Sequence, residues 1–158
     1  MGDLKLTSSA FEDGGEIPRE CGYKNGNEAP PLKINGITKR IKSLALIMDD
    51  PDAMGAVGKV WVHWVIWNIS PGALKIAVED GYKTQTPEIG LSDKGMTDFG
   101  EVGYGGPAPP DKRHTYVFKL YALDSWLDLP EGSTKSELEK AMEGHIIEQV
   151  TLTGTYAP

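Results

Sequence analysis

The sequence has 158 residues, of which 39% are apolar and 25% charged, close to the average of globular proteins. Chains of this length commonly form one domain, so we predict a single domain over residues 1–158. The net charge of −7 disfavours partners that need basic patches, such as nucleic acid or an anionic membrane surface, and the single Cys21 excludes an internal disulfide framework.

Apolar segments predict the strands of the fold. Ser43–Met48 is a short apolar run. Val60–Ile69 is a longer run with apolar residues at odd and even positions, so we expect a central strand that is covered on both faces. Tyr116–Leu123 is rich in aromatic and β-branched residues, which favour strands, and Thr151–Tyr156 could close the sheet.

Glycine and proline predict irregular structure in residues 13–31 and 70–112. Loops as long as the second are usually functional. Thr134-Lys-Ser-Glu137 is a capping-box pattern followed by apolar residues four apart, which predicts an amphipathic helix over about residues 135–149. Because strands dominate and one helix has clear support, we expect a mainly β fold: an antiparallel β-sandwich of two sheets with a peripheral helix.

The sequence also bears on the compartment. Its first residues lack the apolar core of about 7–15 residues that a secretory signal contains, and no apolar run approaches the roughly 18 residues of a membrane span. We therefore expect a cytoplasmic protein without a membrane span.

His63 lies inside the longest predicted strand. Alternate residues of a strand share a face, so His63 is expected beside Trp61, Val65 and Trp67. A buried imidazole needs hydrogen-bond partners, since an unpaired polar group costs about 1–3 kcal/mol. The simpler interpretation is a core histidine bonded to a backbone carbonyl, and the alternative is a ligand contact.

Two further segments could carry chemistry. His114 begins the third strand and follows Gly103–Pro110, a loop whose glycines allow the backbone to approach an anion. Asp49–Asp52 closes the first strand, where a turn is the simplest interpretation and an acid near a histidine is another. Metal-ligand spacings, nucleophile motifs and phosphate loops are absent from the sequence, so we expect no metal, no cofactor and no enzymatic activity.

Three segments carry a resemblance through their joint order and spacing. They are Asp50-Pro-Asp-Ala53 with Trp61-Val-His-Trp-Val65, Asp98-Phe-Gly100 with Gly103-Tyr-Gly-Gly-Pro-Ala-Pro-Pro110, and His114-Thr-Tyr-Val-Phe118 with Tyr121-Ala-Leu-Asp124. Over nearly the whole chain the sequence resembles the phosphatidylethanolamine-binding protein family, which includes Raf kinase inhibitor-like proteins, and it is most similar to the bacterial and archaeal branch. The resemblance implies a β-sandwich with a small pocket near the surface that takes phosphate-like or carboxylate anions.

The resemblance also implies the residues of that pocket. Those expected to bind the ligand are Asp50, His63, Gly106, Pro109, His114 and Tyr116. Those expected to support them are Asp52, which would order the neighbouring turn, and Trp61, which would lie close to His63. A protonated imidazole would give an anionic oxygen a charge-assisted hydrogen bond, about twice as strong as a neutral one.

The chain departs from the family pattern in two places. Met54 stands where the family commonly has a proline, so we expect the Ala53–Met54 peptide to be trans. Tyr156-Ala-Pro158 leaves no helix like the C-terminal one of longer eukaryotic members, so we expect an open pocket unless a second subunit covers it. A homodimer is therefore an open alternative.

Three functions follow as hypotheses. The first is a regulatory or inhibitory module that binds a small anion such as phosphate, phosphoethanolamine or a carboxylate. The second is an inhibitor of serine proteases or kinases, as some family members are, with Tyr82–Gly95 as the exposed loop. The third is a hydrolase that uses the pocket histidines, which the missing nucleophile and oxyanion-hole signatures disfavour.

Overall fold

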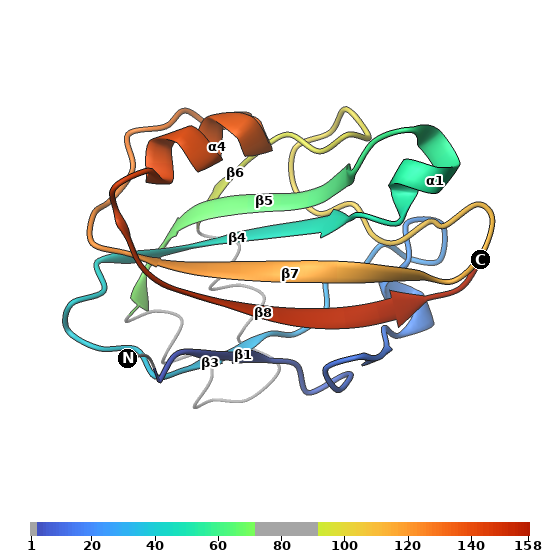
Figure 1. Ribbon diagram of the computed structural model, residues 1–158, viewed down its shortest axis with the longest axis horizontal. Coiled ribbons are helices and arrows are strands. Elements are labelled where there is room, and N and C mark those ends of the chain that lie inside the picture. Colours follow the sequence, from blue (N-terminus) through green and yellow to red (C-terminus); the bar gives the residue numbers. More distant parts are fainter. Residues whose placement is uncertain (1–2, 72–91) are drawn as a thin grey trace.

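The computed structural model describes residues 3–71 and 92–158, whose strands form two sheets (Figure 1). In the smaller sheet β1 (Lys5–Thr7) pairs antiparallel with β3 (Lys33–Asn35). The larger sheet contains, in spatial order, β2 (Gly15–Glu16), β8 (Ile146–Tyr156), β7 (His114–Leu123), β4 (Ser43–Asp50), β5 (Trp61–Ile69) and β6 (Asp93–Lys94). Neighbouring strands of this sheet are antiparallel, except that β2 runs parallel to β8. The predicted β-sandwich of two sheets is confirmed.

The helices with both ends in the described part of the chain are short and peripheral. They are the 3-10 helix η1 (Arg19–Cys21), α1 (Ala53–Val57) and α4 (Lys135–Met142). The described residues contain no cis peptide bond, so Ala53–Met54 is trans as predicted. Within the same residues, no helix is long and apolar enough to cross a membrane.

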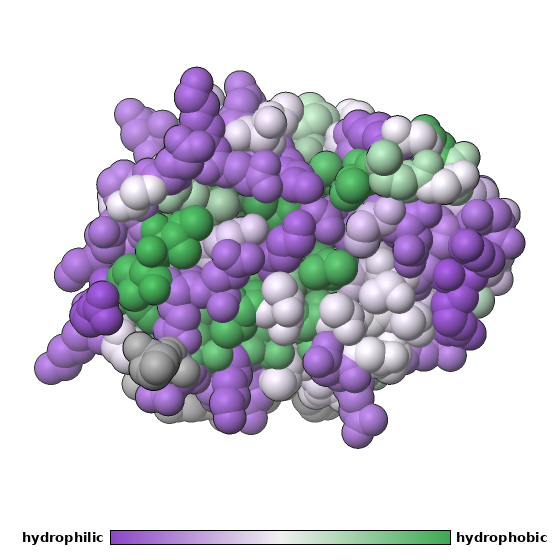
Figure 2. All heavy atoms as spheres, viewed as in Figure 1, coloured by the Kyte–Doolittle hydropathy of each residue, from purple (hydrophilic) through white to green (hydrophobic). Residues whose placement is uncertain are grey.

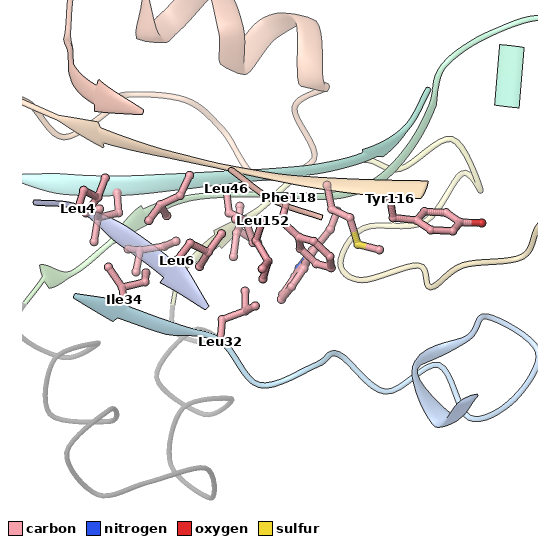
Figure 3. Close-up of a cluster of buried hydrophobic side chains, with 14 of the residues drawn as sticks. Leu4, Leu6, Leu32, Ile34, Leu46, Tyr116, Phe118 and Leu152 are labelled. Atoms are coloured by element: carbon pink, nitrogen blue, oxygen red, sulfur yellow. The ribbon is translucent and has the colours of Figure 1, made fainter. Parts of the chain in front are cut away.

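Each face of the larger sheet covers its own apolar core. The face toward β1 and β3 buries leucines and aromatic residues of both sheets and of the residues just before β1 and β3, among them Leu4, Leu6, Leu32, Leu46, Phe118 and Leu152 (Figure 3). The other face packs beneath α4 and buries Ala45, Ile47, Val65, Trp67, Leu138 and Met142. Burial stabilises the fold by about 1.5–3 kcal/mol for each large apolar side chain. The rigid platform that results holds the strand ends that carry the candidate site.

The predicted strands are present, with small differences in position. β4 extends two residues past Met48, and β7 begins two residues before Tyr116. β5 is covered on both faces as predicted, but it is not central: it pairs with β4 along its length and with the two-residue β6 on its other side. The segments predicted to be irregular contain β2, η1, β6 and an isolated β-bridge between Met96 and Val102 in their described parts, and residues 72–91 lie outside the description.

The expected position of His63 is wrong in one respect, because β5 contains a bulge. Met48 pairs with Trp64 while the next residue of β4, Asp49, pairs with Val62, so His63 is the extra residue. A bulge interrupts the alternation of faces. His63 therefore lies against Tyr116, on the face toward the smaller sheet, and does not share the α4 face with Val65 and Trp67.

The helix predicted over residues 135–149 is wrong beyond Met142. The capping box is present, with Glu137 N donating to Thr134 Oγ1 and Thr134 N donating to Glu137 Oε1. Gly144 has a φ of +81°, which glycine adopts without the penalty of a Cβ and which ends many helices. The chain continues as β8 from Ile146, five residues before the predicted closing strand.

Candidate functional site

The candidate site lies at one end of the larger sheet, where three neighbouring strands meet (Figure 1). Asp50 is the last residue of β4, and it pairs in register with Trp61, the first residue of β5. His114 is the first residue of β7, on the other side of β4. Because these strands are antiparallel, the end of β4 adjoins the beginnings of β5 and β7. Residues far apart in sequence are thus brought together.

A cavity of about 240 Å³ opens at this end. It is lined by Asp50, Ala53, Ala56, Val57, Trp61, His63, Phe99, Ala108, Pro110 and His114. Pockets for drug-sized ligands occupy about 300–1,000 Å³, so this cavity suits a smaller molecule. Most of its wall is apolar, and its polar groups are confined to two histidines, one carboxylate and one indole.

His114 is held between two carboxylates. Its Nδ1 lies 2.6 Å from Asp50 Oδ2 and its Nε2 lies 2.8 Å from Asp111 Oδ1. Carboxylates accept hydrogen bonds, so both ring nitrogens donate and the ring is an imidazolium. Burial lowers the pKa of His114, but the hydrogen bonds to Asp50 and Asp111 outweigh it, and the pKa lies above its ordinary value. The bond to His114 in turn holds the pKa of Asp111 below its ordinary value.

His63 has the opposite electrostatic character. Its side chain is buried, and its Nδ1 lies 2.7 Å from the Gly105 carbonyl oxygen, which can only accept, so Nδ1 carries a proton. Burial lowers the pKa of His63 and outweighs the hydrogen bond to Gly105 and the nearby charge of Asp50. At neutral pH the ring is therefore uncharged, and Nε2 can accept a hydrogen bond.

Three buried polar atoms at the site make no hydrogen bond of good geometry with the described residues, although the Tyr116 hydroxyl is near enough to Asp50 and to the Ala108 backbone for both to affect its pKa. They are Asp50 Oδ1, Trp61 Nε1 and Tyr116 OH, and the only other such atom in the described residues, Trp67 Nε1, belongs to the opposite core. The Tyr116 pKa is raised by burial first and by the charge of Asp50 second, so the hydroxyl keeps its proton. Buried polar groups are paired in more than about 90% of cases, so three exceptions in one place mark the site.

Phe99 and the glycines before β7 shape the wall. The Phe99 ring stacks on Tyr23 at 3.9 Å between centroids and meets the rings of Trp61 and His63 edge to face. A Cβ on Gly106 would collide with the carbonyl oxygen of Cys21, so only glycine fits there. The loop is thereby packed tightly against η1 and the wall of the cavity.

The structure brings together some of the predicted site residues and separates others. Asp50, Trp61, His63 and His114 line the cavity. Tyr116 is fully buried, and its ring lies 5.1 Å from that of His63. Asp52 Oδ2 accepts a hydrogen bond from Thr115 N at 2.8 Å, which ties the turn after β4 to β7.

Two loop residues have other surroundings than the predicted ones. The Gly106 N–H donates to Asn27 Oδ1 at 2.7 Å, so it is already engaged. Pro109 lines a second cavity of about 300 Å³, beside Arg19 and Tyr156. That cavity contains none of the histidines and is not the candidate site.

Sequence reasoning missed several residues of the site. Asp111 precedes His114 by three positions, and only the turn after Pro110 lets the two side chains meet. Phe99 belongs to a motif that carried the family resemblance, but nothing in its spacing indicates that it contacts Trp61 and His63. The apolar residues of α1 also line the cavity. Within the described residues, no group of three or more His, Cys, Asp or Glu side chains could hold a metal ion.

Comparisons with known proteins agree on one family. The family profile described as phosphatidylethanolamine-binding protein matches residues 7–157. A UPF0098 protein of Methanothermobacter thermautotrophicus is 43% identical over 97% of this chain and 98% of its own length, and one of Chlamydia muridarum is 40% identical over the same shares. A crystal structure of a homologue of this family from Chlamydia trachomatis covers 99% of this chain and 98% of its own, with a TM-score of 0.81 and 36% identity. The structure of Escherichia coli YbcL, described as a member of the mammalian family, covers 98% of each chain with a TM-score of 0.80 and 28% identity.

Proposed function

The chain belongs to the phosphatidylethanolamine-binding protein family and to its UPF0098 group, and from this premise we propose that its cavity binds a small phosphate- or carboxylate-bearing ligand. The observation that carries the proposal is the set of three unpartnered buried polar atoms on Asp50, Trp61 and Tyr116. The indole N–H of Trp61 and the hydroxyl of Tyr116 can donate to an oxyanion, whereas Asp50 Oδ1 is an acceptor.

The polar groups favour a ligand that still carries a proton. Asp50 Oδ1 and Nε2 of the neutral His63 are acceptors, because the one ring proton of His63 is on Nδ1 and bonded to Gly105, so a fully ionised group would face two acceptors. A phosphate monoanion offers a P–OH donor to these acceptors and oxygens to the donors on Trp61 and Tyr116. Phosphoethanolamine offers the same oxygens and an ammonium donor.

The cavity is better suited to binding than to turnover. Its described lining contains no serine, threonine, cysteine or lysine that could act as a nucleophile. Both ring nitrogens of His114 are engaged, so this residue has no free nitrogen for proton transfer. We propose a ligand-binding regulatory module and not an enzyme.

Inhibition of a protease or kinase has weaker support. The loop Tyr82–Gly95, which motivated that hypothesis, lies outside the described residues except for residues 92–95. No described feature favours this function, so it stays a prediction from the resemblance.

Calorimetric titration with inorganic phosphate, phosphoethanolamine and acetate tests the proposal, and vesicles of phosphatidylethanolamine distinguish a lipid headgroup from a free anion. We expect saturable binding of at least one soluble ligand. Binding should weaken as pH rises, because a phosphate monoester such as phosphoethanolamine loses its second proton near a pKa of about 6, and inorganic phosphate about one unit higher, and because the His114 imidazolium is lost above its raised pKa.

Two histidine variants complete the design. His63→Gln should weaken binding. His145→Gln is the matched control, since His145 is exposed and bonds to Asp124 after the other end of β7. Absence of heat with every ligand between pH 5.5 and 8, or equal loss in both variants, would refute the proposal.

A further inference from the structure

His114 has no hydrogen left to offer to a ligand. Its Nδ1–H is bonded to Asp50 and its Nε2–H to Asp111, at 2.6 and 2.8 Å. His114 is nevertheless the one imidazolium among the residues that line the cavity. An anionic oxygen can therefore bond to it only if one of the two carboxylates leaves.

Burial decides which carboxylate can leave. The side chain of Asp50 is 4% exposed and lies at the end of β4, so a release would strand a charge in the interior. The side chain of Asp111 is 44% exposed and lies in the loop before β7, so water can solvate it once it turns away. Asp111 Oδ1 also accepts from the adjacent Lys112 N–H at 2.9 Å, a local bond that water can replace.

The charges around His114 point in the same direction. The carboxylates that face the ring are Asp50 from β4 and Asp111 from the loop, with Asp52 beside them on the turn before α1. Two other titratable side chains lie near His114, and neither is charged. His63 of β5 lines the cavity and is neutral, and Tyr116 of β7 contacts the rings of His114 and His63 and is protonated. With Asp111 in place, the two carboxylates and one imidazolium leave a net charge of −1, which opposes an anion.

We propose that Asp111 is a specificity-determining residue: its carboxylate occupies the His114 donor that an anionic ligand oxygen would take, so a ligand binds by displacing it. This inference rests on the proposed function of the cavity and names the competitor that the ligand must overcome. A ligand with one negative charge meets less repulsion than a dianion while it displaces Asp111. The site thereby favours singly charged ligands over fully ionised phosphates.

Asp111→Asn tests the inference with inorganic phosphate as the probe. The amide keeps the shape of the side chain but carries no charge, so its bond to the imidazolium lacks the attraction between opposite charges. We expect this variant to bind phosphate about tenfold more tightly than the wild type, with the larger gain at pH 7.5, where phosphate is mostly a dianion. Asp111→Ala should show a gain in the same direction.

Asp128→Asn is the matched control. Asp128 is exposed and follows the other end of β7, which spans ten residues or about 30 Å, so its variant removes the same charge far from the cavity. Its affinity for phosphate should equal that of the wild type. A gain shared by Asp128→Asn would attribute the effect to net charge and overturn the inference.

The remaining outcomes separate the two proposals. Equal or weaker binding by Asp111→Asn, when the wild type binds, overturns the inference and leaves the proposed function intact. Binding by the variant alone would refute the proposed function of the wild type, because its site would then not take phosphate, and the inference would fall with it. Binding by neither protein refutes the proposed function and the inference with it. In nitrogen NMR spectra of the wild type, phosphate should shift His114 Nε2, which changes partner, more than Nδ1, which keeps Asp50.

Discussion

The pair formed by Asp50 and His114 should make an unusually large contribution to stability for a single hydrogen bond. Both side chains are almost fully buried, at 4% and 1% exposure. Removing one partner of a buried ion pair typically costs about 3–5 kcal/mol, and the lower part of this range applies here because Asp111 stays bonded to the ring. Asp50→Asn keeps the shape and a carbonyl acceptor, and a neutral hydrogen bond returns about 0.5–1.5 kcal/mol. We therefore expect the variant to lose about 2–4 kcal/mol of unfolding free energy at pH 6.

Urea unfolding measures this loss. With a slope of about 2 kcal/mol per molar, in the middle of the usual range, the midpoint should fall by about 1–2 M. The loss should shrink as pH rises through the His114 pKa, which is raised: the contribution is complete below the ordinary value near 6.5 and disappears above the raised one.

Asp111→Asn is the internal comparison, because it removes the other carboxylate of the same ring. Asp111 is exposed, so solvent screens its charge, and the midpoint should stay near that of the wild type. An Asp50→Asn loss below about 0.5 kcal/mol, or an equal loss in Asp111→Asn, would refute the reasoning that burial sets the strength of the pair.

Three further predictions concern separate parts of the fold. Gly106→Ala should lower the free energy of unfolding in urea by at least about 1–3 kcal/mol, because its Cβ meets the Cys21 carbonyl. The Cβ of Gly55→Ala in α1 meets no atom within 4 Å, so this variant should be neutral or more stable by up to about 1 kcal/mol, and equal effects of the two variants would contradict the packing. The His63 pKa is lowered by burial, so the wild type should lose stability as pH falls from about 6.5 toward that pKa, and a His63→Gln protein with the same loss would disprove this origin. Thr134→Ala should lose about 1 kcal/mol through its capping box, and an unchanged thermal midpoint would show that the cap is dispensable.

The strands could be predicted because their composition is unambiguous. Ser43–Met48 and Tyr116–Leu123 form strands within two residues of the predicted limits, since apolar and β-branched runs have few alternatives in a sandwich. The end of α4 was harder to predict from the sequence. Ile146 and Val150 are four apart, a spacing that fits one helix face and also every second position of a strand. Gly144 is the residue type that commonly follows the end of a helix, and its left-handed conformation shows why α4 ends before it.

The site was less predictable because it depends on pairing across strands. Strand alternation places His63 with Val65 and Trp67, and only the register between β4 and β5 reveals the bulge that turns it toward Tyr116. The role of Asp111 has the same origin, since no spacing rule makes a loop aspartate the second partner of His114. Order along the chain therefore identified the candidate residues, whereas their protonation states required the fold.

Nitrogen NMR of the histidine rings during a phosphate titration tests the central proposal most directly. The chain has three histidines, so each ring can be assigned, and His145 provides a control within the same molecule. We expect phosphate to shift the signals of His63 and His114 in a saturable way at pH 6 and to leave those of His145 unchanged. Unchanged signals of His63 and His114 at millimolar phosphate, or equal shifts of all three rings, would contradict a binding site in this cavity.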